Sequence, residues 1–233
     1  MSTHSIWRLL LGLIVVMTLG GCSSALGSGN AGSGAGNANN QITLSVLVGE
    51  LNLAGTAGRL LTEAYTDGNT MIDLLRKSGV AAFAADGYSI TEVNRITLSS
   101  GLMWEIQVNG KKLTDWNSKV ERGSAIALTV KAADAGAQLQ PIIITVNGGS
   151  EQPELTHSHV LPYTEELTVR GLMKKSGMIT LAEDNKTILT VMDYARLSNE
   201  EWKLKVNDKG LLGNGMDMKL RPQDKLEIAL ILK

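Results

Sequence analysis

Few residues of this chain have side chains that commonly do chemistry. His157 and His159 alternate on an expected strand and so share a face, with Glu154 nearby, which could present two imidazoles to a metal ion. The alternative is a pair of solvated residues on an edge strand. Two ligands do not complete a metal site, and no Asp-x-Asp or EF-hand pattern adds carboxylates. We therefore expect neither a bound metal nor a cofactor.

The motifs of common catalytic sites are also missing from the sequence. It has no Gly-x-Ser-x-Gly nucleophile elbow and no Walker loop. Beyond an expected signal peptide, only His157 and His159 could serve a Ser-His-Asp triad. We expect a protein that is not an enzyme.

The single cysteine, Cys22, indicates a membrane anchor. Arg8 precedes an apolar run over residues 9–19, which is shorter than the ~20 residues that span a bilayer. The run ends in Leu-Gly-Gly before Cys22 and resembles the bacterial lipobox, whose cysteine becomes lipidated and N-terminal after cleavage. The alternative is an ordinary secretory peptide followed by an unrelated cysteine. We expect residues 1–21 to be a lipoprotein signal peptide and Cys22 to hold the protein at the extracytoplasmic face of the cell membrane.

Residues 22–40 consist almost entirely of Ser, Gly, Ala and Asn, which is typical of a disordered, flexible tether. The whole chain has 22 Lys and Arg against 23 Asp and Glu, a formal net charge of −1. No clustered basic surface is visible, so we expect no nucleic-acid partner.

Two copies of one stretch organise the rest of the chain. Residues 70–79 (TMIDLLRKSG) recur as residues 168–177 (TVRGLMKKSG), with five of ten positions identical. The same offset of 98 residues places Trp202 at the position of Trp104. We infer an internal duplication, with one module over residues 41–133 and a second over residues 141–233.

Each copy of this stretch predicts a short helix. Thr70 is a suitable N-cap, Asp73 completes a capping box, and Gly79 suits the left-handed position after the helix. In the second copy Gly171 replaces the capping aspartate, so we expect that helix to begin at Thr164 instead.

Alternating apolar residues predict strands on both sides of each helix. The sequence Asn109-Gly110 adds a strong hairpin signal, because both residues tolerate positive φ. The predicted strands cover residues 42–46, 59–65, 88–96, 104–108, 124–130, 142–146, 155–163, 187–194, 202–206 and 225–232. The fold class that follows is α+β, with a mixed sheet and one short helix in each module.

Three runs in the first module carry a resemblance. They are Thr70-x-x-Asp-x-Leu, Gly87-Tyr-x-Ile-Thr-x-Val-Asn94 and Trp104-x-x-x-Val-Asn-Gly110. Together they resemble the bacterial transcobalamin-like C-terminal domain, a family of secreted or surface modules related to the cobalamin-contacting domain of animal cobalamin carriers. The resemblance implies tandem β-grasp-like domains in a bacterial lipoprotein. It weakens in the second copy, where Lys186 and Met192 replace Tyr88 and Asn94.

The ligand-binding candidates are Tyr88, Asn94, Trp104 and Asn109. A tryptophan on an alternating strand is either a core residue or an aromatic platform for a ligand, and Asn109 is either a turn residue or a ligand contact. Because Lys186 cannot be a like-for-like core replacement, Tyr88 is expected at the surface.

Two functions are compatible with these observations. The first is a non-catalytic binding module, anchored to the membrane, which contacts a small molecule, a glycan or another envelope protein through the first module. The second is a structural spacer or accessory subunit of a cell-envelope complex. A cleft beside Trp104 would favour the first, and a flat apolar patch would favour the second.

Overall fold

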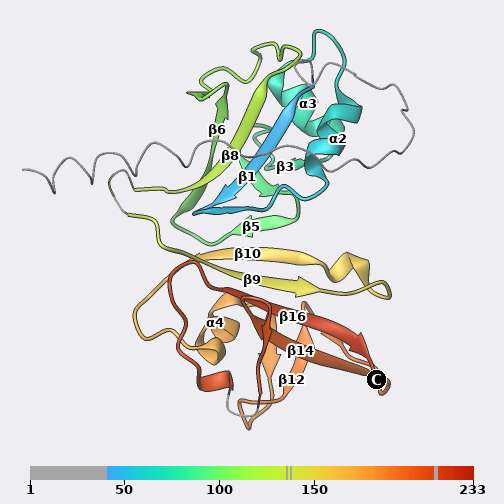
Figure 1. Ribbon diagram of the computed structural model, residues 1–233, viewed down its shortest axis with the longest axis vertical. Coiled ribbons are helices and arrows are strands. Elements are labelled where there is room, and N and C mark those ends of the chain that lie inside the picture. The colour runs from blue at the N-terminus through green and yellow to red at the C-terminus, as the bar shows by residue number, and fades with distance from the viewer. Residues whose placement is uncertain (1–40, 135, 137, 213–214) are drawn as a thin grey trace, which may run out of the picture. The chain divides into compact units, whose positions relative to one another are not determined.

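The computed structural model describes residues 41–134, 136, 138–212 and 215–233, and these belong to one compact unit. The fold is α+β, with mixed sheets and three α-helices among the described residues (Figure 1). The expected α+β class is confirmed.

The N-terminal half, residues 41–133, contains a five-stranded sheet in the order β2-β1-β8-β6-β7. Its central pair, β1 and β8, is parallel, and the other pairs are antiparallel. The strands are β1 (Thr43–Val48), β2 (Leu51–Asn52), β6 (Leu102–Val108), β7 (Lys111–Lys112) and β8 (Ala125–Ala132). Buried and less buried residues alternate along β1, as in a strand with one face on a core.

A second sheet has eight strands in the order β15-β14-β16-β9-β10-β5-β4-β3. It joins strands of both halves, because β10 pairs in parallel with β5. Its members are β3 (Ala81–Phe83), β4 (Ile90–Val93), β5 (Ile96–Leu98), β9 (Pro141–Asn147), β10 (His157–Pro162), β14 (Glu200–Val206), β15 (Lys209–Gly210) and β16 (Lys225–Leu232). A three-stranded sheet contains β11 (Ile179–Leu181), β12 (Ile188–Val191) and β13 (Tyr194–Ala195).

The pairing of the N-terminal half occurs again in the C-terminal half, residues 141–233. There β9 and β16 form the parallel pair, β14 lies antiparallel to β16, and β15 returns from β14 in a hairpin. The antiparallel order of β3, β4 and β5 is matched by that of β11, β12 and β13. Strands at corresponding places in the sequence thus make corresponding pairs.

The two expected helices are present, each with a threonine cap. In α3 (Met71–Ser78) Thr70 accepts a hydrogen bond from the Asp73 N–H, and Gly79 adopts the left-handed conformation. In α4 (Val169–Ser176) Thr168 accepts from the Gly171 N–H at 3.1 Å. The prediction that this second helix begins at Thr164 is wrong, because the cap needs only a hydroxyl and a main-chain N–H three residues on, which glycine also supplies.

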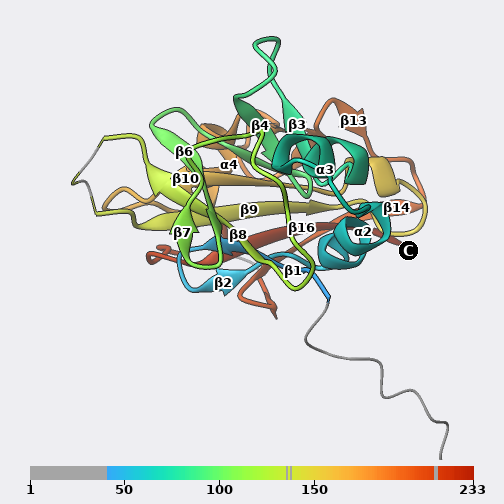
Figure 2. The ribbon, with the colours of Figure 1, turned by 90° about the horizontal axis from the view of Figure 1, so that it is seen from above.

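The N-terminal half has a second α-helix where a strand was expected. Residues 59–65 lie mostly in α2 (Ala57–Ala64), so the predictions of a strand here and of one helix per module are wrong. Ala57 and Leu61 are spaced by four residues and are both fully buried on one face of the helix. The helix packs against α3 and β1 (Figures 1 and 2).

The run over residues 88–96 is not a single strand either. It forms β4, a turn at Asn94 and Arg95, which both have positive φ, and then the start of β5. Asparagine tolerates this conformation through its short polar side chain. The hairpin at Asn109 and Gly110 is confirmed, again with positive φ at both residues.

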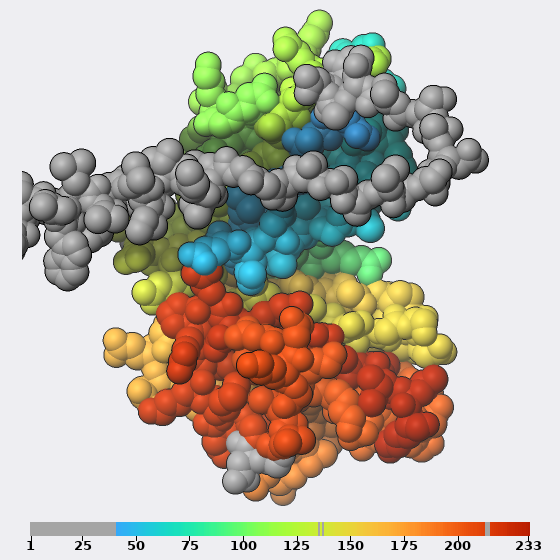
Figure 3. All heavy atoms as spheres, in the orientation of Figure 1, coloured from blue at the N-terminus to red at the C-terminus, as the bar shows by residue number. Residues whose placement is uncertain are grey.

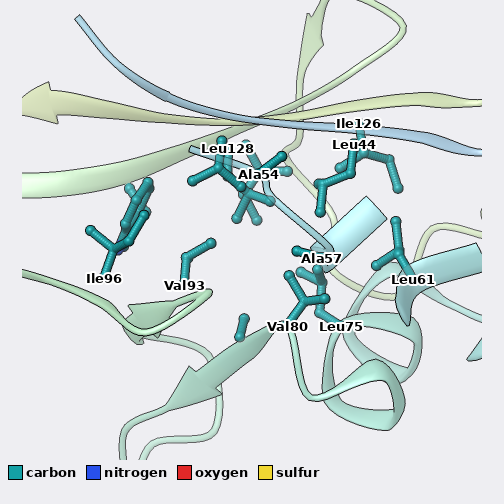
Figure 4. Close-up of a cluster of buried hydrophobic side chains, with 14 of the residues drawn as sticks. Leu44, Ala54, Ala57, Leu61, Leu75, Val80, Val93, Ile96, Ile126 and Leu128 are labelled. Carbon is teal, nitrogen blue, oxygen red and sulfur yellow. The ribbon is translucent and has the colours of Figure 1, made fainter. Parts of the chain in front are cut away.

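Two clusters of buried apolar side chains form the core. The first contains side chains from β1, α2, α3, β4, β5 and β8, many of which converge in Figure 4. The second lies within the C-terminal half, whose atoms run from yellow through orange to red in Figure 3. Leu74 and Leu172 are fully buried in the first and second cluster, respectively. Ile143 packs into the first cluster and its neighbours Ile142 and Ile144 into the second, so β9 is buried on both faces.

Two short 3-10 helices complete the described elements. They are η2 (Pro153–Leu155), just before β10, and η3 (Gly215–Asp217), which packs near α4.

Candidate functional site

A groove of about 510 Å³ lies in the N-terminal half, where the loop before β4, the end of β5 and the start of β6 meet. None of the side chains that line it is charged, and three are aromatic. The lining residues are Tyr88, Ser89, Ile90, Thr91, Leu98, Leu102, Met103, Trp104 and Trp116. Two of the four ligand-binding candidates from the sequence, Tyr88 and Trp104, are therefore brought together here.

The loop that carries Tyr88 is held by a carboxylate. Asp86 accepts hydrogen bonds from the main-chain N–H groups of Tyr88 and Ser89, each at 2.8 Å, and from the Ser89 hydroxyl. These bonds, that of the Ser89 hydroxyl foremost, lower the pKa of Asp86. Tyr88 itself is 53 % exposed, which confirms its expected surface position.

Trp116 lies on the loop after β7 and is fixed by aromatic contacts. Its ring meets Phe83 edge to face, with ring centroids 5.8 Å apart, and the Arg76 guanidinium lies 5.2 Å from the Phe83 centroid. The Trp116 carbonyl accepts from the Ile72 N–H at the start of α3. The groove thus has one aromatic wall that is positioned by the core before any ligand arrives.

Trp104 contributes mainly as a core residue. It is only 8 % exposed, and its indole N–H is buried without a hydrogen-bond partner among the described residues. Trp202 has the same exposure and the same unpartnered N–H. Because both halves share this unpartnered N–H, it does not indicate a ligand of the groove. The interpretation of Trp104 as a core residue is better supported than that of an aromatic platform.

The other two candidates lie outside the groove lining and bond to the protein's own main chain. The Asn94 amide donates to the carbonyls of Leu53 and Ala54 at 2.8 and 3.1 Å. The Asn109 side chain accepts from the Ala125 N–H at 2.8 Å and so ties the hairpin to β8. These geometries support turn and scaffold roles for both asparagines.

In the C-terminal half, Tyr194 and Glu200 pack beside Trp202, the counterpart of Trp104. The Tyr194 hydroxyl donates to the Glu200 carboxylate at 2.8 Å, and the Tyr194 ring meets Trp202 edge to face at 6.3 Å. Desolvation and this carboxylate raise the pKa of Tyr194. Glu200 is only 2 % exposed and also accepts from the Leu197 N–H. At an offset of 98 residues, apolar Ile96 and Leu102 stand at the positions of Tyr194 and Glu200.

The two histidines lie where β10 pairs with β5. His159 Nδ1 is 2.8 Å from the Thr97 hydroxyl, and burial lowers the pKa of His159. His157 Nε2 is 3.4 Å from the Glu92 carboxylate. Within the part of the chain that the structure describes, no three His, Cys, Asp or Glu side chains gather to hold a metal ion. Both histidines thus contact side chains of neighbouring strands, Thr97 in β5 and Glu92 in β4.

Several groove residues were not singled out from the sequence. Met103 is the clearest case, since an exposed methionine on the outward face of an alternating strand is a recognisable surface signal. Leu98 and Leu102 carried no such signal, because each is an ordinary apolar residue of a strand.

Cys22 and residues 22–40 lie outside the described residues. Among the residues that are described, no helix has the length and apolar character needed to cross a bilayer. The chain matches no protein-family model and none of the curated proteins.

Proposed function

We propose that this protein is a membrane-anchored, extracytoplasmic binding module that catalyses no reaction and whose ligand site is the groove of the N-terminal half. The observation that carries the proposal is the difference between the two halves. The groove beside Trp104 is open and aromatic, whereas the region beside Trp202 is occupied by Tyr194 and Glu200. Aromatic walls with a few polar groups are typical of sites that bind ligands.

We further propose that the two halves are tandem β-grasp-like modules, residues 41–133 and 141–233, that resemble the transcobalamin-like C-terminal domain. The repeated strand pairing and the paired helices α3 and α4 support this origin. A further parallel is that β10 pairs antiparallel with β9, as β2 pairs antiparallel with β1. The second module would be a diverged copy that acts as a scaffold.

The proposed anchor rests on the lipobox-like sequence before Cys22. Residues 1–21 would be removed as a signal peptide, and residues 22–40 would join the lipidated cysteine to the first module. The module would then face the outside of the cytoplasmic membrane, where ligands of the cell envelope are available to it.

The lining of the groove supports binding without catalysis. Ser89 and Thr91 supply hydroxyl groups, that of Ser89 already donating to Asp86, and none of the lining residues is an acid or a base. A site of this composition can hold a ligand by stacking, apolar contact and a few hydrogen bonds.

The test is a titration of the full chain with cobalamin and with soluble envelope glycans, followed by tryptophan fluorescence. Tyr88→Ala removes an exposed ring from the groove and should weaken the binding of any ligand that this titration detects by about tenfold or more. Lys186→Ala is the matched control at the corresponding place in the second module. Equal effects of the two changes on the binding of a detected ligand would contradict the proposal.

A second candidate function, an accessory subunit of an envelope complex, is favoured by one apolar surface in the C-terminal half. Leu197 and Leu232 are both more than half exposed, and Glu200 contacts the former and pairs with the latter. If this surface binds a partner, the double variant Leu197→Ser and Leu232→Ser should lose that partner. Size-exclusion chromatography of detergent-extracted membranes should then show the protein in a smaller species than the wild type.

A further inference from the structure

One edge of β6 is left open beside the groove. On one side β6 pairs with β8 along its whole length, but on the other side β7 pairs only with Gln107 and Val108. Within the described part of the chain, no strand pairs with residues 102–105 on this side. An open edge is a template for another extended chain unless the protein covers it.

The pairing of β6 with β8 fixes which main-chain N–H and C=O groups of β6 point to the open side. The Ile106 carbonyl accepts from the Leu113 N–H at 2.8 Å, on the side away from β8. Because alternate residues of an antiparallel strand bond to the same side, Leu102 and Trp104 also present their main-chain groups there. The Leu102 N–H donates to the Ser99 carbonyl. The Leu102 carbonyl and both main-chain groups of Trp104 have no partner among the described residues.

The corresponding edge in the C-terminal half differs at one main-chain group. There the Arg196 guanidinium donates to the main-chain carbonyl of Glu200 at 3.2 Å. Leu98 and Leu102 stand at these two positions in the N-terminal half, and a leucine side chain cannot donate. The Glu200 carbonyl therefore has a side-chain partner, whereas the Leu102 carbonyl has none among the described residues.

We propose that the groove binds an extended, uncharged peptide segment, which adds to the sheet as an antiparallel strand on β6. Only an extended main chain presents donors and acceptors in the alternation that Leu102 and Trp104 require. Because no lining side chain is charged, a charged side chain of the ligand would find no ion-pair partner inside the groove. Tyr88 and Met103, both exposed, contact the side chains of the added strand. This inference rests on the proposed function, since it names the class of ligand for the same groove.

The first test screens acetylated, amidated octapeptides without charged side chains for binding to the full chain. In the tightest binder, N-methylation of an amide that faces β6 should weaken binding by about tenfold, because it removes one main-chain hydrogen bond and adds a clash. N-methylation of the next amide, which faces away, should have little effect. Hydrogen exchange of the Trp104 amide should slow in the complex. If N-methylation weakens binding equally at the amide that faces β6 and at the amide that faces away, the proposed strand pairing is wrong.

The second test closes the edge by substitution. Leu98→Arg places a guanidinium where Arg196 lies in the other half and should weaken peptide binding by about tenfold or more. Leu189→Arg adds the same charge at an exposed position outside the groove and should leave the affinity unchanged. If no octapeptide binds while cobalamin or a glycan binds in a Tyr88-dependent way, the peptide inference fails and the proposed function stands. If none of these probes binds, both fail.

Discussion

The Tyr194 hydroxyl donates a hydrogen bond of 2.8 Å to the Glu200 carboxylate beside Trp202. At an offset of 98 residues the N-terminal half has Ile96 and Leu102, two apolar residues that cannot form such a pair beside Trp104. The pair also has an energetic role, because a buried carboxylate is costly unless it accepts hydrogen bonds.

Tyr194→Phe removes one donor to Glu200 and keeps the ring that packs on Trp202. We expect a lower midpoint temperature of unfolding, because a carboxylate that is 2 % exposed loses a partner. Tyr163→Phe is the control, since no side-chain hydrogen bond of Tyr163 is present in the described part of the chain. Thermal unfolding followed by circular dichroism measures both variants. An unchanged midpoint for Tyr194→Phe would contradict this role of the pair.

Leu74→Ala and Leu172→Ala should each reduce the free energy of unfolding by about 2–5 kcal/mol, since both leucines are fully buried. Because β9 contributes to both cores, we expect the two changes to lower the midpoint of one common transition. Denaturant unfolding followed by fluorescence and by circular dichroism measures this. Leu60→Ala, on the exposed side of α2, is the control and should cost far less.

Two separate transitions, one sensitive only to Leu74→Ala and the other only to Leu172→Ala, would contradict the common unfolding unit. They would instead mean that the pairing of β5 with β10 contributes little to the stability of either half.

Asp184 should make the free energy of unfolding depend on pH in the acid range. Hydrogen bonds from the main-chain N–H groups of Thr187 and Lys186, and from the Thr187 hydroxyl, lower the pKa of Asp184 from 3.8 to about 2. Because the folded pKa lies below the unfolded one, this contribution is present above pH 3.8 and is lost as the pH falls to about 2. Asp184→Asn should flatten the pH dependence of the free energy of unfolding in that window.

Thr187→Val, which removes one donor to Asp184 and keeps the shape, should give a slope between those of the wild type and Asp184→Asn. Denaturant titrations at several pH values provide the slopes. A wild-type slope in Asp184→Asn would mean that other carboxylates dominate this range.

How far the sequence predicts this structure depends on how local each signal is. The α3 helix and the Asn109 hairpin are confirmed because caps and turns are encoded within a few residues. The α2 helix was missed because its short pattern, with Leu60 next to Leu61, fits a strand as well as a helix. Packing against β1 and α3 decides between them.

The groove was only partly foreseeable for the same reason. Tyr88 was expected at the surface because lysine replaces it in the second copy. Whether the region beside Trp104 is open depends on three separate segments, which meet only in the folded chain. Comparing Leu98 and Leu102 with Arg196 and Glu200 reveals a change of residue type, but the hydrogen bond from Arg196 to the Glu200 carbonyl is visible only in the structure.

Cys22→Ala tests the proposed anchor. The lipobox-like sequence predicts that the wild type fractionates with membranes and incorporates labelled fatty acid, whereas the variant stays unprocessed or becomes soluble. Membrane fractionation with acyl labelling measures both outcomes. Ser23→Ala is the control next to it and should behave as the wild type. Unlabelled wild-type protein that is wholly soluble would contradict the anchor.

The most direct measurement of the central claim is a map of the main-chain amides that change when a ligand binds. The isotope-labelled full chain would be titrated with the tightest-binding member of a panel of cobalamin, envelope glycans and uncharged octapeptides. Our account predicts that the largest chemical-shift changes fall on Tyr88, Thr91 and the residues from Leu102 to Trp104. Changes confined to the C-terminal half, around Tyr194 and Glu200, would contradict it.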